Sequence, residues 1–172
     1  MASSSGSIRE LVDLFYESLY RYAFRLSGSA PDADDLTQET FCKAQSQLKQ
    51  LRDRERAKPW LFSILRNLYL LRLRSAQQHA TISLEAVAEL PQSLPDNLPE
   101  IEPEQLQRAL DDLPEVFRTP IILYYFEDFS YKDIAEQMNL PIGTVMSRLA
   151  RAKGILRQRL LPALNGRATD GL

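Results

Sequence analysis

The chain has 172 residues, enough for one ordinary domain or two small ones, and its 44% hydrophobic and 26% charged residues are typical of a globular protein rather than a disordered one. No apolar run approaches the roughly 18 residues that span a bilayer, and the N-terminus lacks the basic and apolar segments of a secretion signal. The single cysteine, Cys42, excludes an internal disulfide and a cysteine-based zinc site. We therefore expect a protein of the reducing cytoplasm, without membrane insertion and with Cys42 in a helical core.

The net charge of −2 is unevenly distributed. Residues 1–75 carry 12 basic and 9 acidic side chains, residues 76–114 carry 1 basic and 8 acidic, and residues 115–172 carry 8 basic and 6 acidic. Two mildly basic segments therefore flank an acidic one. Because local clusters decide phosphate contact, the negative net charge does not exclude a nucleic-acid partner.

The pattern of apolar residues in the first 75 positions predicts three helices. Apolar residues recur at helical spacing from Ile8 to Leu26, and the pattern stops at Gly28 and restarts after Pro31. Aspartates crowd this new start, where carboxylates favour the helix dipole. A third helix is expected from about Lys58 through Arg74. No alternation typical of strands occurs anywhere in the chain, so the predicted fold class is all-α.

A proline-rich acidic segment divides the chain. Prolines recur every four residues at positions 91, 95, 99 and 103, and proline disfavours helix interiors. We predict domains at 1–75 and 104–165, a flexible linker at 76–103 with one helical turn near 84–90, and a disordered tail at 166–172. The alternative is a long ordered loop inside a single domain, which is uncommon.

The second lobe contains a predicted helix-turn-helix. Ser130 and Asp133 form a capping box that starts one helix, Asn139 suits the left-handed conformation that ends it, and Pro141 suits the opening of the next. Val145, Leu149, Ala152 and Leu156 form a core stripe on this last helix. Its opposite face carries Thr144, Ser147, Arg148 and Arg151, and Lys153 belongs to the same basic run.

This basic run indicates DNA contact. No acidic residue lies between positions 142 and 160, whereas a helix that merely packs usually has a solvated face of mixed charge. Hydroxyls and arginines near the start of a second helix suit phosphate and base contact in a major groove. The alternative, a solvated basic face on a packing helix, stays open on the residues alone.

Two further groups of polar residues lie in the first lobe. Asp35, Gln38 and Glu39 share one exposed side of the second helix, which by itself is equally consistent with a capped surface helix. The third helix carries Trp60 near its start and Asn67 in its middle. Basic residues dominate from 43 to 74, with 9 basic and 2 acidic side chains. Aromatic rings beside positive charge suit an unstacked single strand, although a lone tryptophan is more often part of a core.

Three stretches together resemble the extracytoplasmic-function sigma factors of bacterial RNA polymerase. They are LYRYAFRLSGSAPDADDLTQETFCKA, AKPWLFSILRNLYLLRLR and the stretch from LDDLPEVFRTP to GILRQRL. The resemblance spans both lobes, and it implies a subunit that binds core RNA polymerase and directs it to promoters through −10 and −35 recognition and promoter melting.

The resemblance also implies roles for individual residues. Polymerase binding at the β′ clamp helices falls to Asp35, Gln38 and Glu39. Single-strand binding at the −10 element is implied for Asn67. We predict the same role for Trp60, Arg66, Arg72 and Arg74 from their aromatic or basic character. Recognition of the −35 duplex is implied for Thr144, Ser147, Arg148 and Arg151, and we add Lys153 because it belongs to the same basic run. The second lobe is also expected to contact the β-flap, and an anti-sigma factor is an expected partner.

The sequence departs from the family pattern at two positions. Leu71 stands four residues after Asn67, where an acid is common, and Met146 stands before Ser147, where a basic residue is common. The second departure puts the expected −35 sequence in doubt rather than the mode of docking.

No catalytic constellation, cofactor motif or metal-ligand set is present, so we expect no enzyme, no cofactor and no metal. The one histidine, His79, is expected to be solvated at the edge of the linker. Two other functions stay open: a stand-alone helix-turn-helix regulator with an N-terminal protein-interaction domain, and a partner-sequestering adaptor that never contacts DNA.

Overall fold

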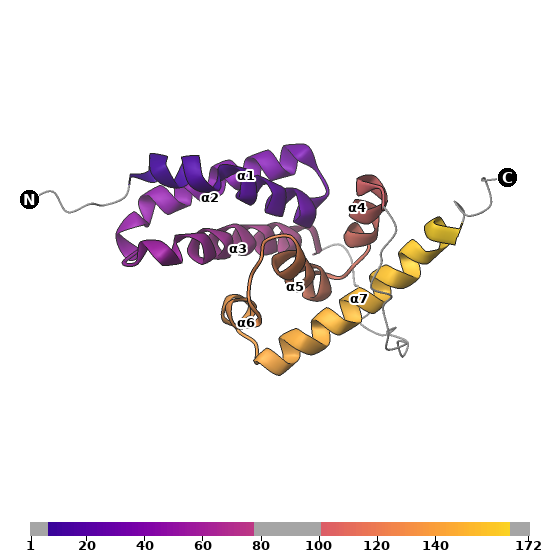
Figure 1. Cartoon of the computed structure of the whole chain (residues 1–172). Coiled ribbons are helices and arrows are strands. Elements are labelled where there is room, and N and C mark those ends of the chain that lie inside the picture. The colour runs from indigo at the N-terminus through magenta and orange to yellow at the C-terminus, as the bar shows by residue number, and fades with distance from the viewer. Residues whose placement is uncertain (1–6, 78–100, 166–172) are drawn as a thin grey trace, which may run out of the picture. The chain divides into compact units, whose positions relative to one another are not determined.

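The computed structural model describes residues 7–77 and 101–165, which are helical and contain no strand (Figure 1). The helices are α1 (Ile8–Ser27), α2 (Ala30–Ser46), α3 (Ala57–Gln77), α4 (Pro103–Asp111), α5 (Glu115–Tyr125), α6 (Tyr131–Met138) and α7 (Ile142–Asn165), with short 3-10 turns η1 (Leu48–Gln50) and η2 (Arg54–Arg56). Contacts divide the chain into two compact units, Met1–Ser83 and Leu84–Leu172. The prediction of an all-α protein with two helical domains is confirmed.

Several predicted features fall outside the described residues. They are most of the acidic linker, its helical turn near 84–90, His79 and the tail at 166–172. The domain boundaries stay predictions. In the described part of the chain, no helix combines the length and the apolar composition that crossing a membrane requires.

The ends of α1 and the start of α2 are set by local hydrogen bonds. The Ser7 hydroxyl accepts the Arg9 N–H at 3.2 Å and begins α1. Gly28 ends α1 in the left-handed conformation, with φ of 69°, and donates its N–H to the Phe24 carbonyl at 2.7 Å. This is the glycine cap that satisfies a terminal carbonyl without a Cβ clash. The Ser29 hydroxyl then caps α2.

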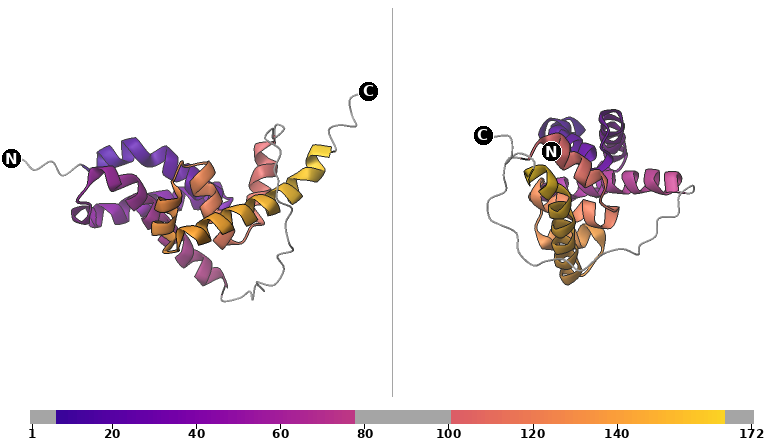
Figure 2. Two further views of the ribbon diagram at one scale, coloured as in Figure 1. Left: turned by 60° about the horizontal axis from the view of Figure 1, so that its bottom comes forward. Right: turned by 90° about the vertical axis from the view of Figure 1, so that its right-hand side faces the viewer.

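Helices α1, α2 and α3 pack pairwise and enclose the core of the first unit (Figure 2). The Tyr22 and Phe62 rings stack at a centroid distance of 4.8 Å, and both are fully buried. The Tyr69 hydroxyl donates to the Leu26 carbonyl at 2.9 Å, close to the end of α1. Aromatic packing and one buried hydrogen bond therefore fix α3 against α1.

In the second unit, α7 contacts each of α4, α5 and α6. Two arginines tie the elements together near the end of α4. The Arg118 guanidinium donates to the carbonyls of Asp111 and Leu113, at 2.9 and 2.6 Å, and so satisfies groups that a helix end leaves without partners. Arg159 pairs with the Asp112 carboxylate at 2.5 Å, which fixes α7 beside the α4–α5 turn.

Candidate functional site

The predicted helix-turn-helix is formed by α6 and α7. The Ser130 hydroxyl accepts the Asp133 N–H at 3.1 Å, which is the N-cap bond of a capping box. The same hydroxyl also donates to the Asp133 carboxylate at 2.8 Å. Asn139 ends α6 with φ and ψ of 52°, and the Leu140 N–H donates to the Ala135 carbonyl at 2.9 Å. The predicted start and end of α6 are therefore confirmed.

Helix α7 begins directly after this turn. The Pro141 carbonyl accepts the N–H groups of Thr144 and Val145 at 3.0 and 3.2 Å, so proline stands where its missing N–H costs nothing. The predicted core stripe is buried at Val145, Leu149 and Ala152, whereas Leu156 is half-buried. On α6, the buried residues are Ile134, Ala135 and Met138.

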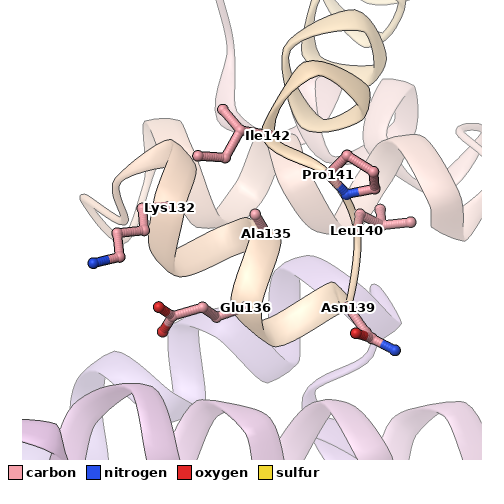
Figure 3. A pocket seen from close by; sticks show the side chains of 7 residues that line it. All are labelled: Lys132, Ala135, Glu136, Asn139, Leu140, Pro141 and Ile142. Carbon is pink, nitrogen blue, oxygen red and sulfur yellow. The ribbon is translucent and has the colours of Figure 1, made fainter.

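A shallow hollow of about 440 Å³ lies between α6 and the start of α7 (Figure 3). Its lining residues are Lys132, Ala135, Glu136, Asn139, Leu140, Pro141 and Ile142. One wall carries the charged ends of Lys132 and Glu136, and the other is formed by the turn and by Ile142, whose side chain is 48% exposed. The start of α7 therefore presents an apolar side chain to solvent.

The predicted basic face of α7 divides into exposed and half-buried residues. Ser147 and Arg151 are exposed, whereas Thr144 and Arg148 are half-buried at its edge. Lys153 lies elsewhere: its ammonium is 5.2 Å from the centroid of the Tyr125 ring of α5. The structure thus groups four of the five predicted residues and separates Lys153 from them.

We call the solvent-facing side of the first three turns of α7 the reading surface. It consists of the exposed residues Gly143, Met146, Ser147, Ala150 and Arg151, and the exposed Ile142 lies at its border. Gly143, Met146 and Ala150 were absent from the predicted set, because the predicted face followed the arginines and so lies to one side of this surface. The helical period could have found these three residues, because it places them on the side of α7 opposite the buried Val145 and Leu149.

Three tyrosines beside α7 were also missed. The Tyr124 ring stacks on the Tyr131 ring at 4.9 Å and meets Tyr125 edge-on at 5.0 Å. A side-chain hydrogen bond with Tyr124 raises the pKa of the Tyr131 hydroxyl. Tyr125 and Tyr131 are partly exposed. Only the tertiary structure brings the end of α5 against the start of α6, so no sequence pattern indicated this cluster.

In the first unit, Asp35, Gln38 and Glu39 are all exposed and share one side of α2. Cys42 continues the same side, because it follows Gln38 by four residues and Glu39 by three. The thiol is exposed, so the expectation that Cys42 belongs to the core was wrong. Core positions of α2 are taken instead by residues such as Leu36 and Phe41. We call Asp35, Gln38, Glu39 and Cys42 the exposed α2 face.

The five residues predicted on α3 do not share one face. Trp60, Asn67 and Arg74 are spaced seven residues apart, which places them along one side of the helix. Trp60 is half-buried, and Asn67 and Arg74 are exposed. Arg66 and Arg72 are half-buried on other sides. The Arg72 guanidinium instead pairs with the Glu39 carboxylate of α2 at 2.9 Å.

Leu71 lies on the same side of α3 as Asn67 and is 54% exposed. The position that departs from the family pattern therefore faces solvent beside the predicted DNA-contacting asparagine.

Comparisons with known proteins define the class. The sigma-70 region 2 model matches residues 11–79, and the sigma-70 region 4 model matches residues 103–156. The two matches fall one in each structural unit. The chain therefore belongs to the sigma-70 family.

Curated relatives place the chain within that family. It is 34% identical over 152 residues to the ECF RNA polymerase sigma factor EcfG of Rhodopseudomonas palustris, a match covering 88% of this chain and 84% of the relative. It is 30% identical over 167 residues to the ECF sigma factor SigM of Bacillus subtilis, covering 95% and 99%. The sigma factor RpoE of Bartonella quintana, solved with the anti-sigma factor NepR, superposes with a TM-score of 0.72 at 29% identity, covering 88% of this chain and 95% of that chain. The chain is an ECF sigma factor, a promoter-directing subunit of RNA polymerase.

Proposed function

We propose that this sigma factor docks on core RNA polymerase through the exposed α2 face, binds single-stranded −10 DNA along α3, and binds the −35 duplex through α7. The observation that carries the proposal is the reading surface of α7. A helix-turn-helix with confirmed caps presents hydroxyl and guanidinium groups there, on a helix whose segment 142–160 has no acidic residue.

Docking on the β′ clamp helices is assigned to Asp35, Gln38 and Glu39. Two carboxylates and an amide on one exposed side of α2 suit basic and hydrogen-bonding partners on another helical surface. Their core-facing neighbours are buried, so the three side chains are held on a rigid helix rather than on a loop.

Contact with the −10 strand is assigned first to Trp60, Asn67 and Arg74. An indole, an amide and a guanidinium along one side of α3 supply stacking, base hydrogen bonding and phosphate neutralisation. Arg66 and Arg72 have supporting roles in this proposal, because they lie on other sides of the helix. The exposed Leu71 adds an apolar surface beside Asn67.

Contact with the −35 duplex is assigned to Ser147 and Arg151 at the centre, with Thr144 and Arg148 at the edge. The N-terminal turns of a recognition helix meet base edges, while flanking groups meet phosphates. Lys153, held against Tyr125, lies to one side and adds general positive charge.

The remaining partners follow from the same assignment. The second unit contacts the β-flap, and the protein acts in the cytoplasm, where core polymerase is found, without catalytic activity of its own. An anti-sigma partner is supported by the complex in which the similar RpoE was solved.

Run-off transcription with core polymerase on genomic fragments tests the proposal. The full-length protein should produce specific transcripts only together with core enzyme. Asn67→Ala should lower open-complex formation, and Arg148→Ala combined with Arg151→Ala should lower promoter occupancy. Gln158→Ala, an exposed change further along α7, serves as the control.

A stand-alone regulator would give a different result. Tight, promoter-specific binding by the protein alone, unaffected by core enzyme, would contradict the proposed role. An adaptor that never contacts DNA would leave promoter-dependent transcription unchanged in the double arginine variant.

A further inference from the structure

Two large apolar side chains stand exposed at the start of α7. Ile142 is 48% exposed and Met146 is 51% exposed, one helical turn apart. Single exposed hydrophobic residues are common on protein surfaces and need no explanation by themselves. These two are notable for their place, because the first two turns of a recognition helix are the part that meets base edges.

The neighbours of Met146 leave it prominent. Gly143 precedes it by three residues and Ala150 follows it by four, and both are exposed. A Cβ atom placed on Gly143 would meet no atom within 4 Å. Met146 is therefore the one large apolar side chain of the reading surface. Arg151 lies at the opposite edge of the same reading surface, where it can reach a phosphate or a guanine.

The chemistry of this edge suits one feature of the major groove. A thioether cannot donate a hydrogen bond and accepts one only weakly, so it cannot read the donors and acceptors of the bases. The C5-methyl group of thymine is the apolar feature that the major groove offers. Methionine is flexible and polarisable, which lets it adjust to such a contact.

We propose that Met146 is a specificity-determining residue that contacts a thymine methyl group in the −35 major groove, with Ile142 widening the same apolar contact. The proposal rests on the proposed binding of the −35 duplex by α7. It assigns a thymine preference to the position where a basic side chain would read guanine or phosphate.

Replacing thymine by uracil removes only the methyl group and tests the contact directly. Holoenzyme containing the full-length chain is bound to promoter duplexes in which each −35 thymine is changed to uracil in turn. For the unchanged protein, uracil at one position should weaken promoter binding about fourfold, which is the change in Kd expected for losing one buried methyl group. With Met146→Ala, the same change should have no effect.

Two further variants sharpen the test. Leu161→Ala removes another exposed apolar side chain of α7, and should leave the uracil effect at full size because Leu161 lies beyond the reading surface. Met146→Arg should abolish the uracil effect and shift preference toward guanine at that base pair. Both positions are exposed, so neither change should unfold the protein.

The proposal fails if the −35 element contains no thymine, if no uracil substitution weakens binding, or if Met146→Ala retains the wild-type uracil effect. In each of these cases, specific promoter binding would continue and the proposed function would stand. If holoenzyme containing the unchanged protein shows no promoter-specific binding at all, the proposed function itself is overturned.

Discussion

The Arg72 guanidinium of α3 donates to the Glu39 carboxylate of α2 at 2.9 Å, with the two side chains 38% and 52% exposed. One partner is a residue assigned to DNA and the other a residue assigned to polymerase. The ion pair therefore joins α3 to the exposed α2 face, away from the side of α3 that carries Asn67.

Breaking this pair should affect polymerase binding more than stability. A solvent-exposed ion pair contributes about 0.2–1 kcal/mol, so Glu39→Gln should lower the free energy of unfolding by less than about 1 kcal/mol. Its loss as a docking group should weaken core polymerase binding several-fold. The free energy of unfolding is measured by urea unfolding with Trp60 fluorescence, since Trp60 is the single tryptophan and reports on the first unit. Glu17→Gln, an exposed change on α1, is the control, and equal effects of both variants on polymerase affinity would count against docking by α2.

Two leucines of α3 should behave oppositely on truncation. Leu65 is fully buried, so Leu65→Ala should lower the free energy of unfolding by about 2–5 kcal/mol through lost burial and a cavity. Leu71 is 54% exposed, so Leu71→Ala should change it by less than about 0.5 kcal/mol. Urea unfolding with Trp60 fluorescence compares the two. Similar destabilisation by both changes would contradict the packing of α3.

Asn139 should tolerate glycine better than alanine. Its φ of 52° lies in the left-handed region, where glycine has no Cβ clash and alanine is strained by about 1–2 kcal/mol. Asn139→Gly should therefore keep −35 binding, whereas Asn139→Ala should lower the melting temperature of the second unit and weaken that binding. Circular dichroism and promoter occupancy measure both effects. An alanine variant as stable as the glycine variant would show that the turn does not need this conformation.

Cys42 should report polymerase docking without any substitution. It is the single cysteine, its thiol is exposed, and it lies beside Gln38 and Glu39 on the exposed α2 face. A maleimide should label it readily in the isolated protein, and saturating core polymerase should slow labelling because docking covers the thiol. The −35 duplex alone is the control and should leave the rate unchanged. An unchanged rate with core polymerase would place docking elsewhere.

Arg151 and Lys153 should differ in their effect on DNA binding. Arg151 is exposed on the reading surface, so Arg151→Ala should weaken −35 binding and reduce the salt dependence of log K by about one unit if the residue meets a phosphate. Lys153→Ala should have a smaller effect, because the ammonium lies over the Tyr125 ring at 5.2 Å. Titrations of holoenzyme with promoter duplex at several salt concentrations distinguish them. A larger loss for Lys153→Ala would reverse the assignment.

The sequence by itself determined the parts of this protein whose causes are local. The ends of α6 depend on hydrogen bonds over three to five residues, so Ser130, Asp133 and Asn139 could be assigned from their neighbours. The core stripe of α7 follows from the helical period. The family could be identified because its motifs lie within continuous stretches of both lobes.

Only the tertiary structure decided which surfaces are covered. Glu39 and Arg72 are 33 residues apart, and Lys153 meets Tyr125 from another helix. Helical periodicity predicts neither pairing, because it relates only residues of the same helix. Cys42 looked like a core residue until α1 and α3 covered the opposite side of α2. By sequence, Met146 only replaces an expected basic contact, but its exposure makes it a candidate for an apolar contact with DNA. The physical reason is the same in each case: period and capping fix a helix, whereas burial depends on which other helices pack against it.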